Sequence, residues 1–227
     1  MLDGHWRTSI EKGLRPVGRN LRRTGISADH LTALGMVMAA GAAVAIATGN
    51  LHVGLLLLVL TGLPDALDGA VAKAAGTAGP RGAFFDSVAD RISDSLLLVG
   101  VAWYLATTEG GLMPLLPMAV LAASLVISYE RAKAESLGFN AKGGVMERAE
   151  RIVVLGLGLL FEALLIPVLW VMLALTLLTA VQRFVKVWRQ ASRERPPVLT
   201  ARRASRRRAA RSASTEWRRN LRSRSRR

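Results

Sequence analysis

The sequence contains no cysteine and only three histidines, His5, His30 and His52, which are spread through the first quarter of a 227-residue chain. Disulfide bonds and thiolate metal sites are therefore excluded. The histidines are too dispersed to form a metal site, and no Ser–His pair is evident. A covalent enzyme intermediate therefore has no evident nucleophile.

Lysine and arginine are absent from three long stretches, residues 24–72, 92–130 and 152–182. All 31 cationic residues fall outside these stretches, although the formal net charge is +15 and 51% of the chain is hydrophobic. A soluble basic protein would scatter its cations. Each stretch is long enough for two membrane crossings, since one crossing needs roughly 20 residues. The sequence therefore predicts an all-α integral membrane protein.

We expect six transmembrane helices, at residues 30–48, 51–75, 83–106, 115–134, 149–164 and 167–188. They would form one membrane domain at residues 27–190. Residues 1–26 lack the apolar core of a signal peptide and suit a basic amphipathic helix at the membrane surface. Residues 191–227 are rich in arginine and serine and poor in apolar side chains, which predicts a disordered tail.

Basic residues also predict the orientation of these helices. The N-terminal segment, the connections at 73–82 and 131–151, and the tail are all basic, whereas the other turns have no cations. By the positive-inside rule both termini and both basic connections are cytoplasmic, in a cell (inner) membrane. The tail could bind anionic membrane lipids or only fix the topology. We expect no nucleic acid partner, because the chain is tethered to a membrane.

Four aspartates stand where a membrane helix would not ordinarily carry charge. Asp65 and Asp68 share one helix face at spacing i,i+3, and Asp86 and Asp90 share a face of the next helix at i,i+4. The connection between the two helices is short, so the four carboxylates can converge. Clustered oxygen ligands without histidine or cysteine indicate hard cations such as Mg²⁺ or Mn²⁺. A carboxylate-lined cation transporter is the alternative from another class.

The spacing Asp65-x2-Asp68-Gly69-x2-Ala72-Lys73-x8-Gly82-x3-Asp86-x3-Asp90 resembles the signature of the CDP-alcohol phosphatidyltransferases. Seven of its eight defined positions match, and Lys73 stands where arginine is usual. The resemblance implies two Mg²⁺ ions held by the four aspartates, with Asp90 also acting as the general base. It further implies a homodimer that uses CDP-diacylglycerol.

The resemblance also implies a donor site. The family usually carries Ser-Pro-Asn-x-x-Thr before the first crossing, where this chain has Ser27 to Thr32. It implies that a loop at residues 28–31 touches the cytidine and that Gly69 and Lys73 contact the diphosphate. Gly79 stands where the family often has a loop threonine, three residues before Gly82, so a side-chain contact is absent at that point. The implied donor residues are Ala28, Asp29, His30, Leu31, Gly69, Lys73 and Gly79.

For the acceptor, the runs Ser128–Glu135, Gly143-Gly144, Glu147–Arg151 and Val181–Arg183 resemble family members that use inositol 1-phosphate. Independently, cations from three helix ends face the same aqueous side, and a phosphomonoester needs about two of them. The candidate acceptor residues are Ser128, Arg131, Lys133, Arg151 and Arg183. Any one cation could instead serve only the positive-inside pattern, and glycerol 3-phosphate is the alternative acceptor.

Overall fold

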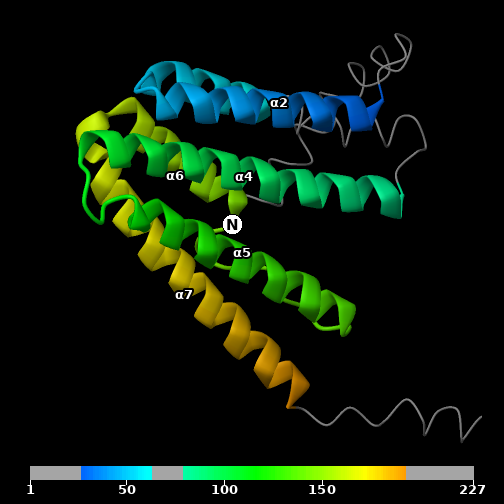
Figure 1. The fold of residues 1–227 in the computed structure, drawn as a ribbon. Helices are drawn as coiled ribbons and strands as arrows, with labels where there is room; N and C mark the ends of the chain where they lie inside the picture. The colour runs from blue at the N-terminus through cyan, green and yellow to red at the C-terminus, as the bar shows by residue number, and fades with distance from the viewer. Residues whose placement is uncertain (1–26, 63–78, 193–227) are drawn as a thin grey trace, which may run out of the picture. The chain divides into compact units, whose positions relative to one another are not determined.

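The computed structural model describes residues 27–62 and 79–192, and the regular structure in both ranges is helical. The elements are α2 (Ala28–Ala47), a helix at Leu51–Gly62, α4 (Pro80–Thr108), α5 (Leu115–Ser136), α6 (Arg148–Leu160), the 3₁₀ turn η1 (Glu162–Leu164) and α7 (Leu165–Ala191) (Figure 1). A compact unit extends to Val187, and a second unit begins at Trp188. The arrangement below concerns the first unit. The amphipathic helix expected at residues 1–26 and the tail beyond residue 192 lie outside the described residues.

Predicted and observed helices agree in order, with differences at their ends. The fifth was expected to continue to residue 164, but α6 ends at Leu160. Phe161 adopts an extended backbone (φ −121°, ψ 95°), the turn η1 follows, and α7 begins at Leu165. Pro167 lies in the first turn of α7, where a missing backbone N–H costs no helical hydrogen bond. The last helix therefore begins two residues before the predicted residue 167.

Within residues 27–62 and 79–192, three helical stretches are long and apolar enough to cross a membrane, namely Ala28–Ala47, Leu115–Ser136 and Glu162–Ala191. Large apolar side chains remain exposed along the helices, including Val37 and Trp103, at 69% and 65%. Such exposure suits contact with lipid. The first half of α4 carries charged residues and is not among the three stretches. These features fit a multi-pass membrane protein.

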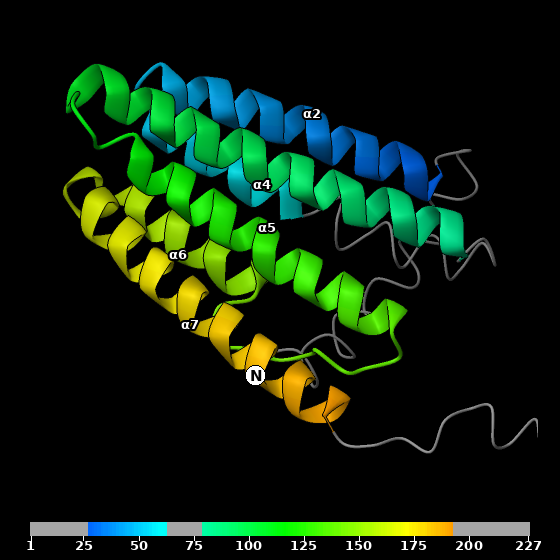
Figure 2. The same ribbon diagram turned by 60° about the horizontal axis from the view of Figure 1, so that its bottom comes forward.

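Close packing of small residues joins α2 to α4. A Cβ atom added to Gly100 of α4 would lie 2.6 Å from the carbonyl oxygen of Ala43 and 2.9 Å from its Cα. Membrane helices commonly approach through such small residues. The contact fixes α4 against α2, and the two run side by side in both ribbon views (Figures 1 and 2).

The helix ends gather at two ends of this unit. The starts of α2 and α4 lie at the same end as the last turn of α5, and the turns after α2 and α4 lie at the other (Figures 1 and 2). The main apolar core includes Ile46, Leu58, Val101, Leu159 and Leu169, all at most 1% exposed. The charged half of α4, with Asp86 and Asp90, lies toward the end where α2 and α4 begin (Figures 1 and 2).

Candidate functional site

Helix α4 begins with a backbone arrangement suited to its sequence. Gly79 is the N-cap in an extended conformation, and Pro80 occupies the first helical position. Asp86 and Asp90 follow one turn apart, and both are half-buried. Asp94, one further turn along, is buried at 8% exposure. A helical period places these three carboxylates on one face of α4.

Gly82 lies in the first turn of α4. Apart from the chain neighbours of Gly82 and the adjacent backbone of its own helix, no described heavy atom lies within 4 Å of the place that a Cβ of Gly82 would take. Packing against a described helix therefore does not explain this glycine. The open space would let a phosphate approach the backbone at this point.

The other half of the expected metal site belongs to a part of the chain that the structure does not describe. Asp65, Asp68, Gly69 and Lys73 lie outside the described residues. Within residues 27–62 and 79–192, no three His, Cys, Asp or Glu side chains gather closely enough to hold a metal ion. Asp86 and Asp90 supply two oxygen-donor side chains on one helix face. Their chemistry fits a hard divalent cation, and convergence with the first pair stays a prediction.

Asp90 lies between two guanidinium groups. Arg148 Nη1 is 2.9 Å from Asp90 Oδ1, and Arg91 Nη2 is 3.5 Å from Oδ2. The Arg148 and Asp90 side chains are 23% and 19% exposed. This partial burial makes charge compensation necessary, because an uncompensated carboxylate in a poorly hydrated site is costly.

A second row of charges lies beneath Asp90. Arg148 Nε donates to Asp94 Oδ1 at 3.3 Å, and Arg151 Nη2 donates to Asp94 Oδ2 at 2.7 Å. The Arg151 and Asp94 side chains are only 6% and 9% exposed. Arg148 and Arg151 are one turn apart at the start of α6, so two successive guanidiniums fasten α6 to the carboxylate face of α4.

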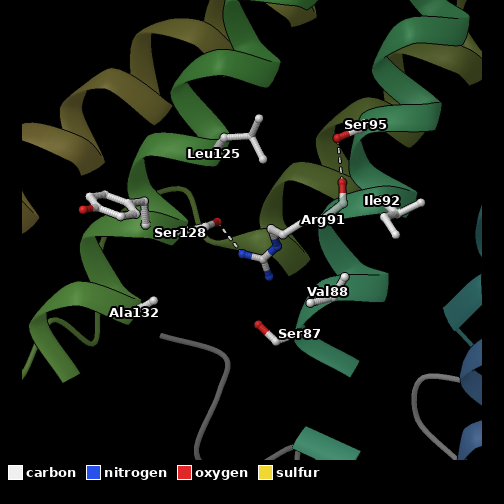
Figure 3. A pocket seen from close by; sticks show the side chains of 9 residues that line it. Ser87, Val88, Arg91, Ile92, Ser95, Leu125, Ser128 and Ala132 are labelled. Atoms are coloured by element: carbon white, nitrogen blue, oxygen red, sulfur yellow. Dashed lines mark hydrogen bonds between the residues drawn. The ribbon is translucent and has the colours of Figure 1, made fainter. Parts of the chain in front are cut away.

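An open pocket of about 490 Å³ lies between α4 and α5, and Arg91, which follows Asp90 in the chain, is one of its lining residues. Figure 3 shows Arg91 reaching from α4 to the hydroxyl of Ser128 on α5, and the apolar side chains of Leu125 on α5 and Ile92 on α4 also line the pocket. Ser128 in turn donates to the Ser124 carbonyl at 2.8 Å. Because Arg91 also contacts Asp90, the predicted acceptor residue Ser128 and the predicted general base share one guanidinium neighbour.

Arg183, on α7, is buried and makes three hydrogen bonds. It donates to the carbonyl oxygens of Ile127 and Gly143, both at 3.0 Å, and to Glu147 Oε1 at 2.6 Å. These bonds join α7 to α5 and to the loop that precedes α6. The hydrogen bond from Met146 N to Thr179 Oγ1, at 3.0 Å, fastens the same loop one turn earlier on α7.

The candidate acceptor residues therefore differ in their surroundings. Arg131 is exposed and pairs with Glu135 at 3.1 Å, and Lys133 is exposed in the last turn of α5. Arg151 and Arg183 are buried and paired with Asp94 and Glu147. Their roles toward a phosphate stay predictions. Phosphate binding would require the two buried guanidiniums to use donors beyond those described above.

The expected donor loop is helical in the structure. Residues 28–31 form the first turn of α2, because Ser27 caps it: Ser27 Oγ accepts from His30 N and His30 Nδ1 accepts from Ser27 N, each at 3.3 Å. The expectation of a loop here was wrong. Arg81, at the start of α4, reaches Asp29 at 3.3 Å, so these predicted donor residues lie near Gly79.

Three ion pairs of this site were not predicted from the sequence: Arg148 with Asp90, Arg148 with Asp94, and Arg183 with Glu147. A signal was present in the sequence. Arg148 and Arg151 occupy the first turns of a helix, where the macrodipole disfavours positive charge. Two arginines there indicate nearby carboxylates from another element.

Comparison with known proteins extends over most of the chain. The family model for CDP-alcohol phosphatidyltransferase matches residues 26–190. Archaetidylinositol phosphate synthase of Methanothermobacter thermautotrophicus is 37% identical over 174 residues, which cover 74% of this chain and 86% of that protein. Phosphatidylinositol phosphate synthase of Streptomyces avermitilis is 33% identical over 206 residues, which cover 85% of this chain and 84% of that protein.

Solved structures give the same result. Phosphatidylinositol phosphate synthase of Mycobacterium tuberculosis with CDP-DAG bound matches with a TM-score of 0.73 and 31% identity, covering 77% of this chain and 93% of that one. The same enzyme in complex with manganese and citrate matches with a TM-score of 0.72 and 30% identity, and the match covers 77% of this chain and 88% of that one. The likeness therefore extends to sequence and fold together.

Proposed function

This chain belongs to the CDP-alcohol phosphatidyltransferase family, and from that premise we propose that it transfers the phosphatidyl group of CDP-diacylglycerol to inositol 1-phosphate. The products are phosphatidylinositol phosphate and CMP. The observation that carries the proposal is the pair Asp86 and Asp90 on one face of α4, with Arg91 and Arg148 beside Asp90. Arg151 pairs with Asp94, one turn further along the same face. The site thus combines oxygen donors for cations with guanidiniums suited to phosphates.

In the proposed mechanism Asp90 takes the proton of an inositol hydroxyl as general base. The hydroxyl oxygen forms a bond to the phosphorus of the phosphatidyl group, and the bond from that phosphorus to CMP breaks. Two divalent cations, Mg²⁺ or Mn²⁺, held by Asp65, Asp68, Asp86 and Asp90 would neutralise charge on the diphosphate. Gly69 and Lys73 would contact that diphosphate.

The acceptor assignment is supported by the names of the relatives. The two relatives above are named for archaetidylinositol phosphate and phosphatidylinositol phosphate, so their lipids differ whereas inositol phosphate is common to both. The proposed phosphate ligands are Ser128, Arg131, Lys133, Arg151 and Arg183. Arg131, in a surface pair with Glu135, and Lys133 are both exposed and accessible to a phosphate from the aqueous side, and Ser128 lies next to Arg91.

The proposal includes an arrangement in the membrane. Six crossings with both termini and the site on the cytoplasmic side of the cell membrane agree with the charge pattern. Residues 1–26 would lie at the surface, residues 27–190 would form the catalytic domain, and residues 191–227 would form a basic tail beside anionic lipids. We also propose a homodimer, following the family resemblance.

The test is CMP release by purified protein in detergent or vesicles with CDP-diacylglycerol and Mg²⁺. Inositol 1-phosphate, glycerol 3-phosphate and free inositol are compared, and Asp90→Asn is the control. Turnover with inositol 1-phosphate alone, lost in the variant, is expected. Turnover with glycerol 3-phosphate instead would refute the acceptor, and no CMP release from folded protein would refute the reaction.

A further inference from the structure

A continuous row of charged groups leads from Asp90 into the protein interior. Arg148 contacts Asp90 through Nη1 at 2.9 Å and Asp94 through Nε at 3.3 Å. Arg151 then meets the other oxygen of Asp94 at 2.7 Å. The carboxylates come from α4 and the guanidiniums from α6, so the row joins two helices.

We propose that Arg148 is a positioning residue for Asp90, and that buried Asp94 is the anchor that holds Arg148 in place. This inference rests on the proposed function, in which Asp90 is both a metal ligand and the general base. It adds residues that act through Asp90 and assigns them no direct contact with the reacting atoms.

The geometry favours Arg148 over Arg91 as the positioning group. Both approach Asp90, but Arg148 is at 2.9 Å and Arg91 at 3.5 Å. A planar guanidinium can hold two acceptors with fixed relative directions, which a lysine ammonium cannot do. Arg148 therefore fixes the carboxylate of Asp90 relative to Asp94, one helical turn away.

Asp94 suits the role of anchor because it has little freedom. Its side chain is 9% exposed, and Arg151, at 6%, is fixed against its second oxygen. A buried carboxylate that accepts from two guanidiniums has few other positions available. The orientation set at Asp94 is thus transmitted by one rigid group to Asp90.

This arrangement gives Arg148 two opposite effects on the site. Its guanidinium holds Asp90 in place, which favours proton abstraction by a correctly placed base. Its positive charge also lies beside a predicted ligand of divalent cations, and like charges repel. Removing Arg148 should therefore slow turnover while it strengthens metal binding. Simple damage to the fold would weaken both.

The experiment compares Arg148→Gln and Arg148→Lys with wild-type full-length protein in detergent. Arg189→Gln is the matched control, because Arg189 is an exposed arginine near the end of α7 that the proposal does not involve. The readouts are kcat, KM for CDP-diacylglycerol, Mn²⁺ affinity by electron paramagnetic resonance without substrates, and Tm.

For Arg148→Gln we expect kcat to fall about 10- to 100-fold, as for a misplaced catalytic group. Mn²⁺ affinity should rise about three- to tenfold, since a unit charge beside a divalent ion is lost. Arg148→Lys keeps the charge, so its Mn²⁺ affinity should stay within about twofold of wild type, while its kcat remains reduced. Arg189→Gln should match wild type.

Three results would overturn the inference. These are an unchanged kcat in Arg148→Gln, a full recovery of kcat by Arg148→Lys, or a joint loss of kcat, Mn²⁺ affinity and Tm in Arg148→Gln. If wild-type protein transfers nothing to inositol 1-phosphate, the proposed function fails separately. The Mn²⁺ measurement still reports on Arg148 in that case.

The anchor is tested by adding Arg148→Gln to Asp94→Asn. With the anchor already removed, the second change should lower kcat by much less than it does in wild type, because residues that act as a unit are not additive. Additive losses would show that Asp94 does not act through Arg148. If Asp94→Asn does not fold, the Arg148 comparison alone decides.

Discussion

Removing the carboxylate of Asp94 should destabilise the protein more than any other single charge change among the pairs described above. Asp94 and Arg151 are 9% and 6% exposed and lie 2.7 Å apart. In Asp94→Asn the Arg151 guanidinium stays buried without its counter-charge, and breaking a buried pair from one side costs about 3–5 kcal/mol. For a chain of this size, each kcal/mol lost from the free energy of unfolding lowers Tm by about 2–4 °C. The Tm of Asp94→Asn should therefore fall by about 6–20 °C.

The assay is thermal unfolding in detergent, followed by the loss of monodisperse protein, with two comparison variants. Arg151→Met should cost less than Asp94→Asn, because Asp94 keeps Arg148 at 3.3 Å. Arg81→Gln breaks an ion pair whose side chains are 91% and 44% exposed. Such a surface pair is worth less than about 1 kcal/mol. A Tm of Asp94→Asn as close to wild type as that of Arg81→Gln would refute the burial argument.

Three further predictions follow from other contacts. Gly100→Ala should lower Tm, at a cost of about 1–3 kcal/mol, because its Cβ would meet the Ala43 backbone at 2.6 Å. Thermal unfolding measures this, and an unchanged Tm would contradict the close approach of α2 and α4. Gly82→Ala should leave Tm within about 2 °C of wild type, since the new Cβ meets no neighbouring side chain or helix among the described residues. It should raise KM for CDP-diacylglycerol, because the added methyl group would fill space through which a phosphate reaches the backbone. An unchanged KM in a CMP-release titration would count against that approach. Chelation with EDTA should abolish CMP release and added Mn²⁺ should restore it, and activity that persists in EDTA would exclude the metal mechanism.

Periodicity and charge predicted the order of the helices well because membrane helices are long apolar segments whose flanks carry the cations. The segment at 115–134 was predicted within two residues of α5 (Leu115–Ser136). The backbone conformation before the first crossing was not predicted correctly. Ser27 and His30 form a capping box at the start of α2, so residues 28–31 are helical, although the family resemblance had suggested a loop.

The site was predicted in part for a similar reason. Asp86 and Asp90 follow from spacing within one helix, which the sequence displays directly. Arg148, which pairs with both Asp90 and Asp94, comes from α6, more than fifty positions away, and no local pattern specifies that pairing. Arg151 was expected at the acceptor phosphate, and the structure adds that it pairs with Asp94 in the interior. Long-range charge pairing depends on packing, which periodicity does not encode.

The same packing connects the two predicted substrate regions. Arg183 donates to Glu147 at 2.6 Å and to the Gly143 carbonyl at 3.0 Å, and Glu147 directly precedes Arg148 in the chain. Arg148 in turn contacts Asp90. A substitution at Arg183 would therefore release the loop that sets the start of α6, as well as remove a cation proposed to meet the acceptor phosphate. A substitution at Arg183 can therefore lower activity either by weakening phosphate binding or by displacing Arg148. A raised KM for the acceptor at constant kcat would indicate lost phosphate binding, whereas a lowered kcat would indicate displacement of Arg148.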